Sequence, residues 1–309
     1  MNNWRSNATS EVTLIEVGLR DGLQTEPQFV STDVKFDTAR KLIDAGIQNI
    51  QLSSFVQALK VPQMADAEAL ISTSQVLDLK ADMSALVLNP KGLERAIASG
   101  IKCVDISLSA STTHSQKNAG RTLTQALAEV IRMIGDAKSA GLTVRAGIQN
   151  AFICAYEGNI PLARLLELTE IFVSSGAQFI AWADSTGQAN PRQIANTCRA
   201  FQNLNLDIPL ILHLHDTFGR GMSNLCAALD AGIKHFDTSF GGIGGCPYIP
   251  GASGNVATED AVALLESMGV STGISWEKVA KITLEAEQWL TIPTFSKMKT
   301  VLKGLRKYD

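Results

Sequence analysis

Residues 44–50 read Asp44-Ala-Gly46-Ile-Gln-Asn-Ile50: small residues typical of a helix end, then glycine, then an apolar run. Four further stretches repeat this pattern, namely Ala98-Ser-Gly100-Ile-Lys-Cys-Val104, Ser139-Ala-Gly141-Leu-Thr-Val144, Ser174-Ser-Gly176-Ala-Gln-Phe-Ile180 and Asp230-Ala-Gly232-Ile-Lys-His-Phe236. A glycine just past a helix adopts the left-handed conformation at little cost, and the apolar residues after it enter a buried strand. Five such junctions at irregular spacing predict a series of helix-to-strand units.

Apolar stretches and helix-like segments alternate around these junctions. The expected strands are Val12–Gly18, Asn49–Ser54, Ala81–Leu88, Cys103–Leu108, Thr143–Ile148, Gln178–Ala183, Pro209–His213 and His235–Ser239. The expected helices include Asp33–Ala45, Leu123–Ala140, Pro161–Ser174 and Pro191–Asn203. Eight strands alternating with helices favour an α/β fold of the (β/α)8 TIM-barrel type over an open doubly wound sheet. No GxGxxG motif follows the first strand, which weakens the dinucleotide-binding alternative further.

We expect a single domain: a polar leader over residues 1–11, the barrel over 12–270 and a helical extension over 271–309. In the extension, Ser275–Leu290 and Met298–Leu305 read as helices that pack at the side or the mouth of the barrel. Five basic residues lie near the C-terminus, namely Lys297, Lys299, Lys303, Arg306 and Lys307. A solvated helix face is the expected role for them, with contact to an anionic cofactor as the alternative.

Length and composition exclude several classes of protein. The chain has 309 residues, of which 45% are hydrophobic, and a net charge of −3, so one large core is expected and nucleic acid is not an expected partner. No apolar run reaches the roughly 18 residues needed to span a bilayer, so no membrane partner is expected. The leader lacks the apolar segment of a signal peptide, and the five scattered cysteines form no disulfide framework. A cytoplasmic location is therefore expected.

The stretch His213-Leu-His215-Asp216 closes the seventh expected strand. Because strand side chains alternate faces, the two histidines point to the same side. A pair at that spacing suits a divalent metal, but it is also compatible with two histidines hydrogen-bonded to each other. The first strand leaves through Arg20-Asp21, a charged pair that is costly after a buried strand unless it meets a ligand or forms a structural ion pair.

The eighth strand is followed by residues 241–255, in which six of fifteen residues are glycine. Such a loop can open and close, and Cys246 near its middle is placed for proton donation or nucleophilic attack. Asn255 at its end can supply a neutral oxygen ligand. Together Asp21, His213, His215 and Asn255 make a mixed oxygen and nitrogen set, which suits Mg²⁺ or Mn²⁺ with positions left open for a chelating substrate.

Four motifs extend this pattern. They are Glu16-Val-Gly-Leu-Arg-Asp-Gly-Leu-Gln24, Ser53-Ser-Phe-Val56 with Val61-Pro-Gln-Met64, His213-Leu-His-Asp-Thr-Phe-Gly219, and Gly244-Gly-Cys-Pro-Tyr248 with Gly251-Ala-Ser-Gly-Asn-Val-Ala-Thr-Glu-Asp260. From about residue 12 to residue 265 the chain closely resembles the 3-hydroxy-3-methylglutaryl-CoA lyase family, within the metal-dependent TIM-barrel lyases and Claisen condensing enzymes. The cysteine-loop motif is the most specific part of the resemblance.

The resemblance implies an acyl-CoA substrate, a homo-oligomer (dimer or tetramer), and roles for individual residues. Arg20 would stabilise the enolate of the departing acyl-CoA, and Cys246 would return a proton to it. His213 and Asp21 are the candidates for taking the proton from the tertiary hydroxyl of the substrate. The substrate-binding residues implied are Gln24, Gln51, Ser54, Ser111 and Asp184.

Several positions depart from the family pattern near the expected pocket. Gln51 stands where the family usually has glutamate, Gln24-Thr-Glu-Pro27 lacks a lysine, and Asn150–Gly158 lacks a cysteine, a glycine and a proline. These departures leave open a lyase acting on another 3-hydroxyacyl-CoA with a tertiary alcohol. A Claisen synthase and a non-catalytic metal-binding barrel are the remaining alternatives, although such synthases usually carry a longer C-terminal region.

Overall fold

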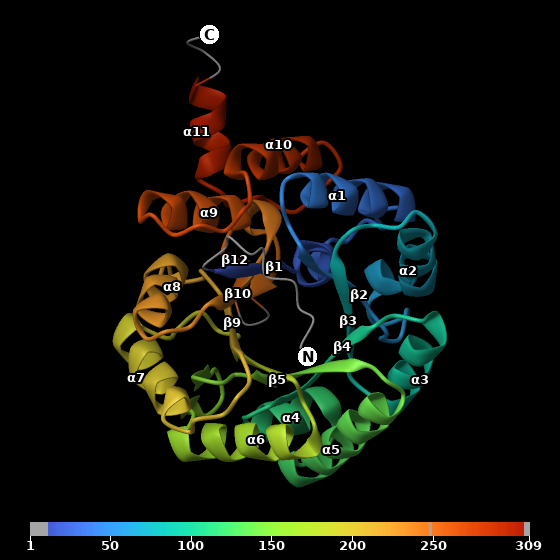
Figure 1. The fold of residues 1–309 in the computed structure, drawn as a ribbon, viewed down its shortest axis with the longest axis vertical. Coiled ribbons are helices and arrows are strands. Elements are labelled where there is room, and N and C mark those ends of the chain that lie inside the picture. The colour runs from blue at the N-terminus through green and yellow to red at the C-terminus, as the bar shows by residue number, and fades with distance from the viewer. Residues whose placement is uncertain (1–11, 247–248, 306–309) are drawn as a thin grey trace.

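The computed structural model describes residues 12–246 and 249–305, and within them all side chains except those of residues 118, 119, 246 and 249–252. In these residues, parallel strands close into a barrel in the order β1-β10-β9-β8-β5-β4-β3-β2 (Figure 1). The barrel strands are β1 (Thr13–Glu16), β2 (Asn49–Ser54), β3 (Asp82–Val87), β4 (Cys103–Ser109), β5 (Thr143–Gln149), β8 (Phe179–Asp184), β9 (Leu210–Leu214) and β10 (His235–Thr238). The expected (β/α)8 barrel is confirmed.

Helices form a ring around the strands, as Figure 1 shows. They are α1 (Thr32–Asp44), α2 (Ala67–Val76), α3 (Pro90–Ser99), α4 (Thr112–Ala119), α5 (Leu123–Ser139), α6 (Leu162–Ser175), α7 (Pro191–Gln202), α8 (Gly221–Asp230) and α9 (Thr258–Ser267). Beyond the ring lie α10 (Trp276–Ala286) and α11 (Met298–Leu305). Because α10 packs against α1 and α9, this extension covers the side of the barrel.

Short elements complete the connections. Four helical turns are η1 (Gly18–Gly22), η2 (Leu23–Thr25), η3 (Pro62–Met64) and η4 (Phe240–Gly242). Two small antiparallel hairpins pair β6 (Ile153–Cys154) with β7 (Gly158–Asn159), and β11 (Gly245–Cys246) with β12 (Ile249–Ser253). Part of the glycine-rich segment after β10 therefore has regular backbone pairing.

The five junction glycines all have the expected left-handed conformation. Their φ angles are +109° at Gly46, +76° at Gly100, +79° at Gly141, +109° at Gly176 and +86° at Gly232. The requirement is strictest at Gly46, where an added Cβ would lie 2.2 Å from the carbonyl oxygen of Gly273. Here the absence of a side chain serves both the backbone conformation and the close packing of the loop before α10.

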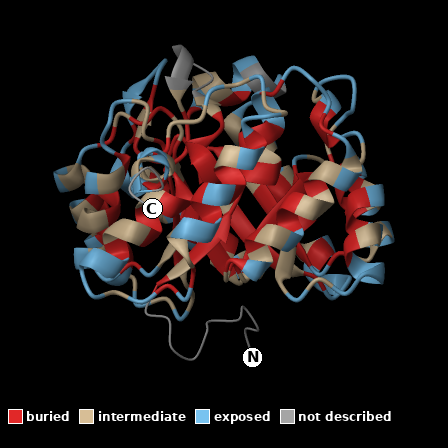
Figure 2. Cartoon of the chain, turned by 90° about the horizontal axis from the view of Figure 1, so that it is seen from above, coloured by how far each residue is buried: buried red, intermediate tan, exposed pale blue. Residues whose placement is uncertain are grey.

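The interior of the barrel is layered along the strands. One apolar cluster, separate from the large core between strands and helices, comprises Ile15, Val17, Phe179, Ala181 and Ile211. Two residues beyond Ile211 on β9 lies His213, and Asp237 is its register partner on β10. Figure 2 shows the buried residues concentrated on the strands and the inner faces of the helices. Along the barrel axis, an apolar layer is therefore followed, toward the carboxyl ends of the strands, by a layer of charged and polar side chains.

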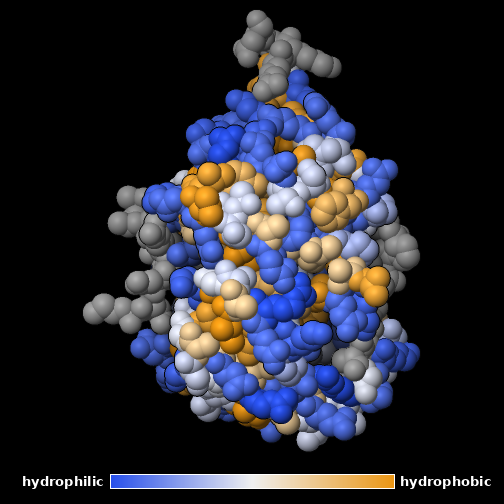
Figure 3. Space-filling model, turned by 90° about the vertical axis from the view of Figure 1, so that its right-hand side faces the viewer, coloured by the Kyte–Doolittle hydropathy of each residue, from blue (hydrophilic) through white to orange (hydrophobic). Residues whose placement is uncertain are grey.

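In the described part of the chain, no helix is both long and apolar enough to span a bilayer. Figure 3 shows the side where α2 and α3 lie outermost, with apolar patches scattered among hydrophilic side chains. The basic residues near the C-terminus are partly paired. Lys299 and Lys303 pair with Glu287 at Nζ–O distances of 2.5 Å and 3.2 Å. These two lysines therefore tie α11 to the chain just after α10. Arg306 and Lys307 lie outside the described residues.

Candidate active site

A cavity of about 420 Å³ opens among the carboxyl ends of the barrel strands. Its wall includes six of the residues singled out from the sequence: Arg20, Asp21, Gln24, Gln51, His213 and His215. The remaining polar wall residues include Asp105, Ser107, His114, Arg145, Gln149 and Asp237, and the apolar ones are Leu86, Leu88, Ile148, Ala181 and Ala183. Residues from several strands and their following loops thus share one chamber, at the end of the barrel where active sites of this fold lie.

The turn after β1 directs Arg20 and Asp21 into this chamber. In η1 the carbonyl oxygen of Val17 accepts hydrogen bonds from the amides of Asp21 (2.7 Å) and Gly22 (3.3 Å), which makes a wide π-helical turn. Such turns are rare and occur frequently at functional sites. Arg20 Nη1 pairs with Asp21 Oδ1, and Arg20 Nε donates to Gln51 Oε1 on β2. Both partners fix the guanidinium at the cavity wall.

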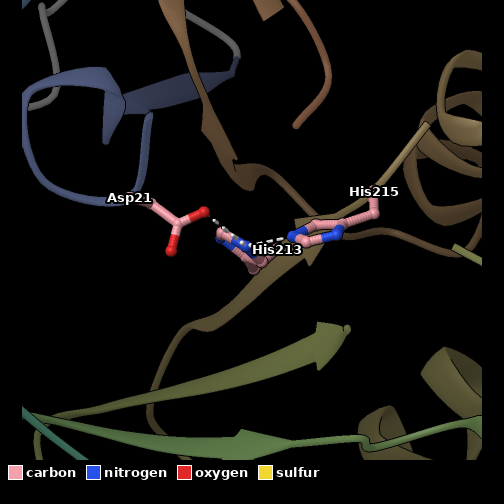
Figure 4. Close-up of side chains that lie close together, drawn as sticks. All are labelled: Asp21, His213 and His215. Atoms are coloured by element: carbon pink, nitrogen blue, oxygen red, sulfur yellow. Dashed lines mark hydrogen bonds and ion pairs between the residues drawn. The ribbon is translucent and has the colours of Figure 1, made fainter. Parts of the chain in front are cut away.

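Asp21, His213 and His215 form a compact ligand cluster (Figure 4). Their ligand atoms lie within 4.8 Å of one another. His213 Nε2 lies 3.1 Å from His215 Nε2 and 3.8 Å from Asp21 Oδ2. A hydrogen bond between the two rings explains the 3.1 Å contact. It does not explain why the carboxylate of Asp21 lies beside them.

The surroundings of His215 and Asp21 favour the protonation states in which these side chains can coordinate a cation. Burial and the neighbouring His213 lower the pKa of His215 to about 4, so His215 is neutral near pH 7. Burial raises the pKa of Asp21, but the positive charge of Arg20 and the electrostatic effect of the two histidines outweigh burial and hold that pKa well below its usual range. A neutral imidazole beside an ionised carboxylate is the state in which both can coordinate a cation.

Asn255 joins the cluster from the end of the glycine-rich segment. Its Nδ2 donates to Asp21 Oδ2 (2.9 Å) and to the carbonyl oxygen of Ile243 (3.0 Å), while its buried Oδ1 has no hydrogen-bond partner among the residues that the structure describes. A backbone bridge between His215 and Asn255 keeps the two side by side. An unpartnered buried oxygen beside a carboxylate and two imidazoles fits a divalent cation.

A second charged layer lies directly under the cluster. His213 Nδ1 lies 3.0 Å from Asp237 Oδ2, and Arg145 bonds the same carboxylate while also pairing with Asp105 (Nε–Oδ1 3.0 Å). The sequence patterns above do not single out Asp105, Arg145 or Asp237. The available signal is a charged residue inside an apolar strand, as in Val104-Asp-Ile106, Val144-Arg-Ala146 and Phe236-Asp-Thr238.

Three expected substrate-binding residues lie outside the cavity wall. Ser54 is buried in β2, and Ser111 caps α4 by accepting the amide of His114 (3.0 Å). Asp184 accepts the amide of Ala189 (3.1 Å), and burial raises its pKa to about 6. In this structure Ser111 and Asp184 organise the backbone behind the wall, and direct substrate contact by these three residues stays a prediction.

The buried carboxylate of Glu16 holds the base of the glycine-rich segment. Glu16 accepts hydrogen bonds from the amides of Gly18 (2.7 Å) and Phe240 (3.0 Å), and so joins the turn after β1 to the turn after β10.

Cys246 belongs to β11, but its side chain lies outside what the structure describes. Its predicted role and the predicted opening of the segment therefore stay predictions.

Known proteins are similar to this chain in sequence and in fold. A family model described as HMGL-like matches residues 11–284. The chain is 37% identical over 282 residues to the hydroxymethylglutaryl-CoA lyase YngG of Bacillus subtilis, covering 91% of this chain and 92% of that protein. It is also 37% identical over 289 residues to the (R)-citramalyl-CoA lyase of Chloroflexus aurantiacus, covering 91% and 90%.

Solved structures agree with these matches. The crystal structure of the Bacillus subtilis HMG-CoA lyase superposes with a TM-score of 0.89 at 35% identity, covering 95% of this chain and 98% of that one. An HMG-CoA lyase from Acinetobacter baumannii, in complex with coenzyme A and 3-methylmalate, gives a TM-score of 0.87 at 31% identity, with 96% of each chain covered. The similarity therefore spans the whole barrel rather than one motif.

Proposed function

The chain belongs to the HMGL-like family, and from this premise we propose that it is a divalent-metal-dependent carbon–carbon lyase. Its proposed reaction is the retro-Claisen cleavage of 3-hydroxy-3-methylglutaryl-CoA to acetyl-CoA and acetoacetate. The observation that carries the proposal is the position of Arg20 beside the Asp21–His213–His215 cluster in one cavity. A cation site next to a fixed guanidinium is what cleavage to a thioester enolate requires.

Asp21, His213, His215 and Asn255 are the residues that would hold the cation, which is proposed to be Mg²⁺ or Mn²⁺. When bound, the cation supplies Lewis acidity to the substrate's hydroxyl and carboxylate oxygens and helps to orient them. All four side chains are neutral or singly negative, so the cluster carries one formal negative charge. With a divalent cation bound, the site would carry a net charge of +1, which suits an anionic substrate.

The proposed chemistry divides among residues of the cavity. A base, Asp21 or His213, takes the proton from the tertiary C3 hydroxyl, and the electrons of that O–H bond form the new C3 carbonyl. The C2–C3 bond breaks, and its electron pair becomes the enolate of acetyl-CoA, whose oxygen Arg20 stabilises. Cys246 is proposed to donate the proton that converts C2 of this enolate to a methyl group. Atoms and charge then balance as one thioester and one 3-oxo acid.

The test is metal-dependent release of acetoacetate and acetyl-CoA from 3-hydroxy-3-methylglutaryl-CoA. We expect Asp21→Ala to abolish turnover and Cys246→Ser to reduce it strongly. Retained activity in a metal-stripped Asp21→Ala protein contradicts the proposal. Release of free coenzyme A from acetyl-CoA and a 2-oxo acid would indicate a synthase instead, and metal binding without any turnover would indicate a non-catalytic barrel.

A second candidate is a lyase for another 3-hydroxyacyl-CoA with a tertiary alcohol. Its support is the neutral Gln51 against Arg20, together with the polar wall at Ser107, His114 and Gln149. A cavity with this wall suits a short substrate with polar substituents at C3. Comparing 3-hydroxy-3-methylglutaryl-CoA with citramalyl-CoA as substrates tests the choice, since the preferred substrate has the higher kcat/KM.

The cytoplasmic location and the homo-oligomeric state stay predictions.

A further inference from the structure

The two ring nitrogens of His213 face different surroundings. Its Nε2 faces Asp21 and His215 in the ligand cluster, and its Nδ1 lies 3.0 Å from Asp237 Oδ2 below. A neutral imidazole carries one proton, and only the nitrogen without it can coordinate a cation. The position of that proton therefore decides whether His213 is ready to act as a ligand.

The surroundings of Asp237 determine where the proton lies. Arg145 donates to the same oxygen of Asp237 and is itself held on its other side by Asp105. All three charged side chains are buried, and they connect β10 with β5 and β4 across the barrel. Because a guanidinium only donates hydrogen bonds, Asp237 stays an acceptor toward both neighbours. His213 must then carry its proton on Nδ1.

We infer that Asp237 is a positioning residue: clamped by Arg145, it holds His213 with the proton on Nδ1, so that Nε2 is a ready ligand before any cation binds. This inference rests on the proposed metal-dependent function. Asp237 does not touch the cation site itself, since it acts on the far side of the imidazole ring. Partners of this kind orient metal-binding histidines and raise their basicity.

His215 provides a contrast within the same cluster. Its Nδ1 is buried and has no hydrogen-bond partner among the described residues. No carboxylate therefore selects its tautomer in the way that Asp237 selects that of His213. With His213 Nε2 unprotonated, the 3.1 Å contact between the two Nε2 atoms places the proton of His215 on its Nε2 before a cation binds, and a bound cation should bring both rings to the Nδ1–H form.

The tautomers can be measured directly in the metal-free wild-type protein. With ¹⁵N-labelled histidine, the chemical shifts of Nδ1 and Nε2 report which nitrogen is protonated, and the chain has only four histidines. We expect the neutral ring of His213 to give a single Nδ1–H signal, assigned by its loss in His213→Gln. A His213 ring protonated on Nε2, or averaged between the two tautomers, overturns the inference.

Two variants distinguish the effect of Asp237 on the His213 ring from the effect of losing a buried negative charge. Asp237→Asn and Asp105→Asn each remove one negative charge from the surroundings of Arg145, but only Asp237 contacts His213. In Asp237→Asn, the amide oxygen is drawn to Arg145 and its NH₂ group turns to Nδ1, which moves the ring proton to Nε2. We expect Mn²⁺ affinity, measured by calorimetry, to fall about 10–100-fold in Asp237→Asn and less than about threefold in Asp105→Asn.

The outcomes distinguish this inference from the function on which it rests. A wild-type protein that binds no Mn²⁺ contradicts the proposed function. Mn²⁺ binding that is equally tight in wild type and Asp237→Asn, or equally weakened in both variants, overturns the positioning role alone. Circular dichroism checks that the variants fold, and if Asp237→Asn does not, the wild-type tautomer measurement decides.

Discussion

Gln51 controls how Arg20 is held, through one hydrogen bond from Nε of the guanidinium to the amide oxygen. In Gln51→Leu, Arg20 loses this acceptor but keeps its pairing with Asp21. A guanidinium displaced from the enolate oxygen stabilises the transition state less. We therefore expect kcat to fall about 10–100-fold, while Mn²⁺ affinity stays near that of wild type because no ligand is altered. Steady-state kinetics measures kcat, and calorimetry measures the Mn²⁺ affinity.

The matched control for this prediction is Gln51→Glu, which keeps an acceptor oxygen at the same distance along the side chain. Arg20 should then stay in place, and kcat should remain within about threefold of wild type. If the leucine and glutamate variants lose activity equally, the hydrogen bond to Arg20 is not the role of Gln51.

Glu16 makes stability depend on pH in a direction opposite to most carboxylates. It is fully buried, and burial raises its pKa from 4.5 to about 7. Between these pH values the folded protein binds a proton that the unfolded chain has released, so this group's contribution to the free energy of unfolding falls as pH rises. Glu16→Gln cannot titrate, and its stability relative to wild type should rise across this window by at most about 3 kcal/mol.

Urea denaturation of both proteins at pH 5, 6 and 7 measures this difference. Taking the difference between variant and wild type removes the contribution of all other titrating groups. A difference that stays constant with pH would show that Glu16 is already ionised in the folded protein at pH 5, held so by the donors that surround it.

At the scale of elements, the helix-to-strand junctions allow a test of why glycine is needed. Gly46→Ala places a Cβ 2.2 Å from the carbonyl oxygen of Gly273 at a φ of +109°, so it incurs both a clash and backbone strain. Gly141 has a φ of +79°, but no neighbouring atom of the described chain lies within 4 Å of an added Cβ, so Gly141→Ala incurs the strain alone. We expect destabilisation of more than about 3 kcal/mol and of about 1 kcal/mol, respectively.

Urea denaturation compares the two variants with wild type. The difference between them isolates the packing of the Gly46 junction against the loop before α10. Equal destabilisation would mean that this loop moves aside freely and that the extension does not constrain the barrel there.

The elements were predictable where local signals suffice. Asn49–Ser54 is the same strand in prediction and structure, because a junction glycine and an apolar run mark it. The β11–β12 hairpin was not predictable, since a segment rich in glycine carries no alternating pattern to fix the pairing of Gly245 with Ser253. A charged residue in an apolar strand signals only that it needs a partner. That Arg145 pairs with Asp237, 92 residues away, follows from barrel closure alone.

At the scale of the whole molecule, barrel closure creates the ligand cluster. Asn255 Nδ2 and Asp21 Oδ2 meet across 234 residues of sequence, and β1 reaches β9 only through its neighbour β10. The sequence could predict that these residues share the carboxyl end of the barrel, because every barrel strand exits there. The distances among them depend on the closed sheet, so an unfolded chain has no comparable site for a cation.

Cation binding should therefore stabilise the fold as a whole. A ligand that binds only the folded state adds about 2.7 kcal/mol to the free energy of unfolding at 100 times its dissociation constant. For a chain of this size we expect Tm to rise by roughly 4–8 °C with saturating Mn²⁺ and to fall back when a chelator is added. Asp21→Ala should lose the shift, whereas Ser107→Ala, altered in the same cavity wall but outside the ligand cluster, should keep it. A wild-type Tm that does not change with Mn²⁺, measured by calorimetry at fixed ionic strength, contradicts a cation site at this cluster.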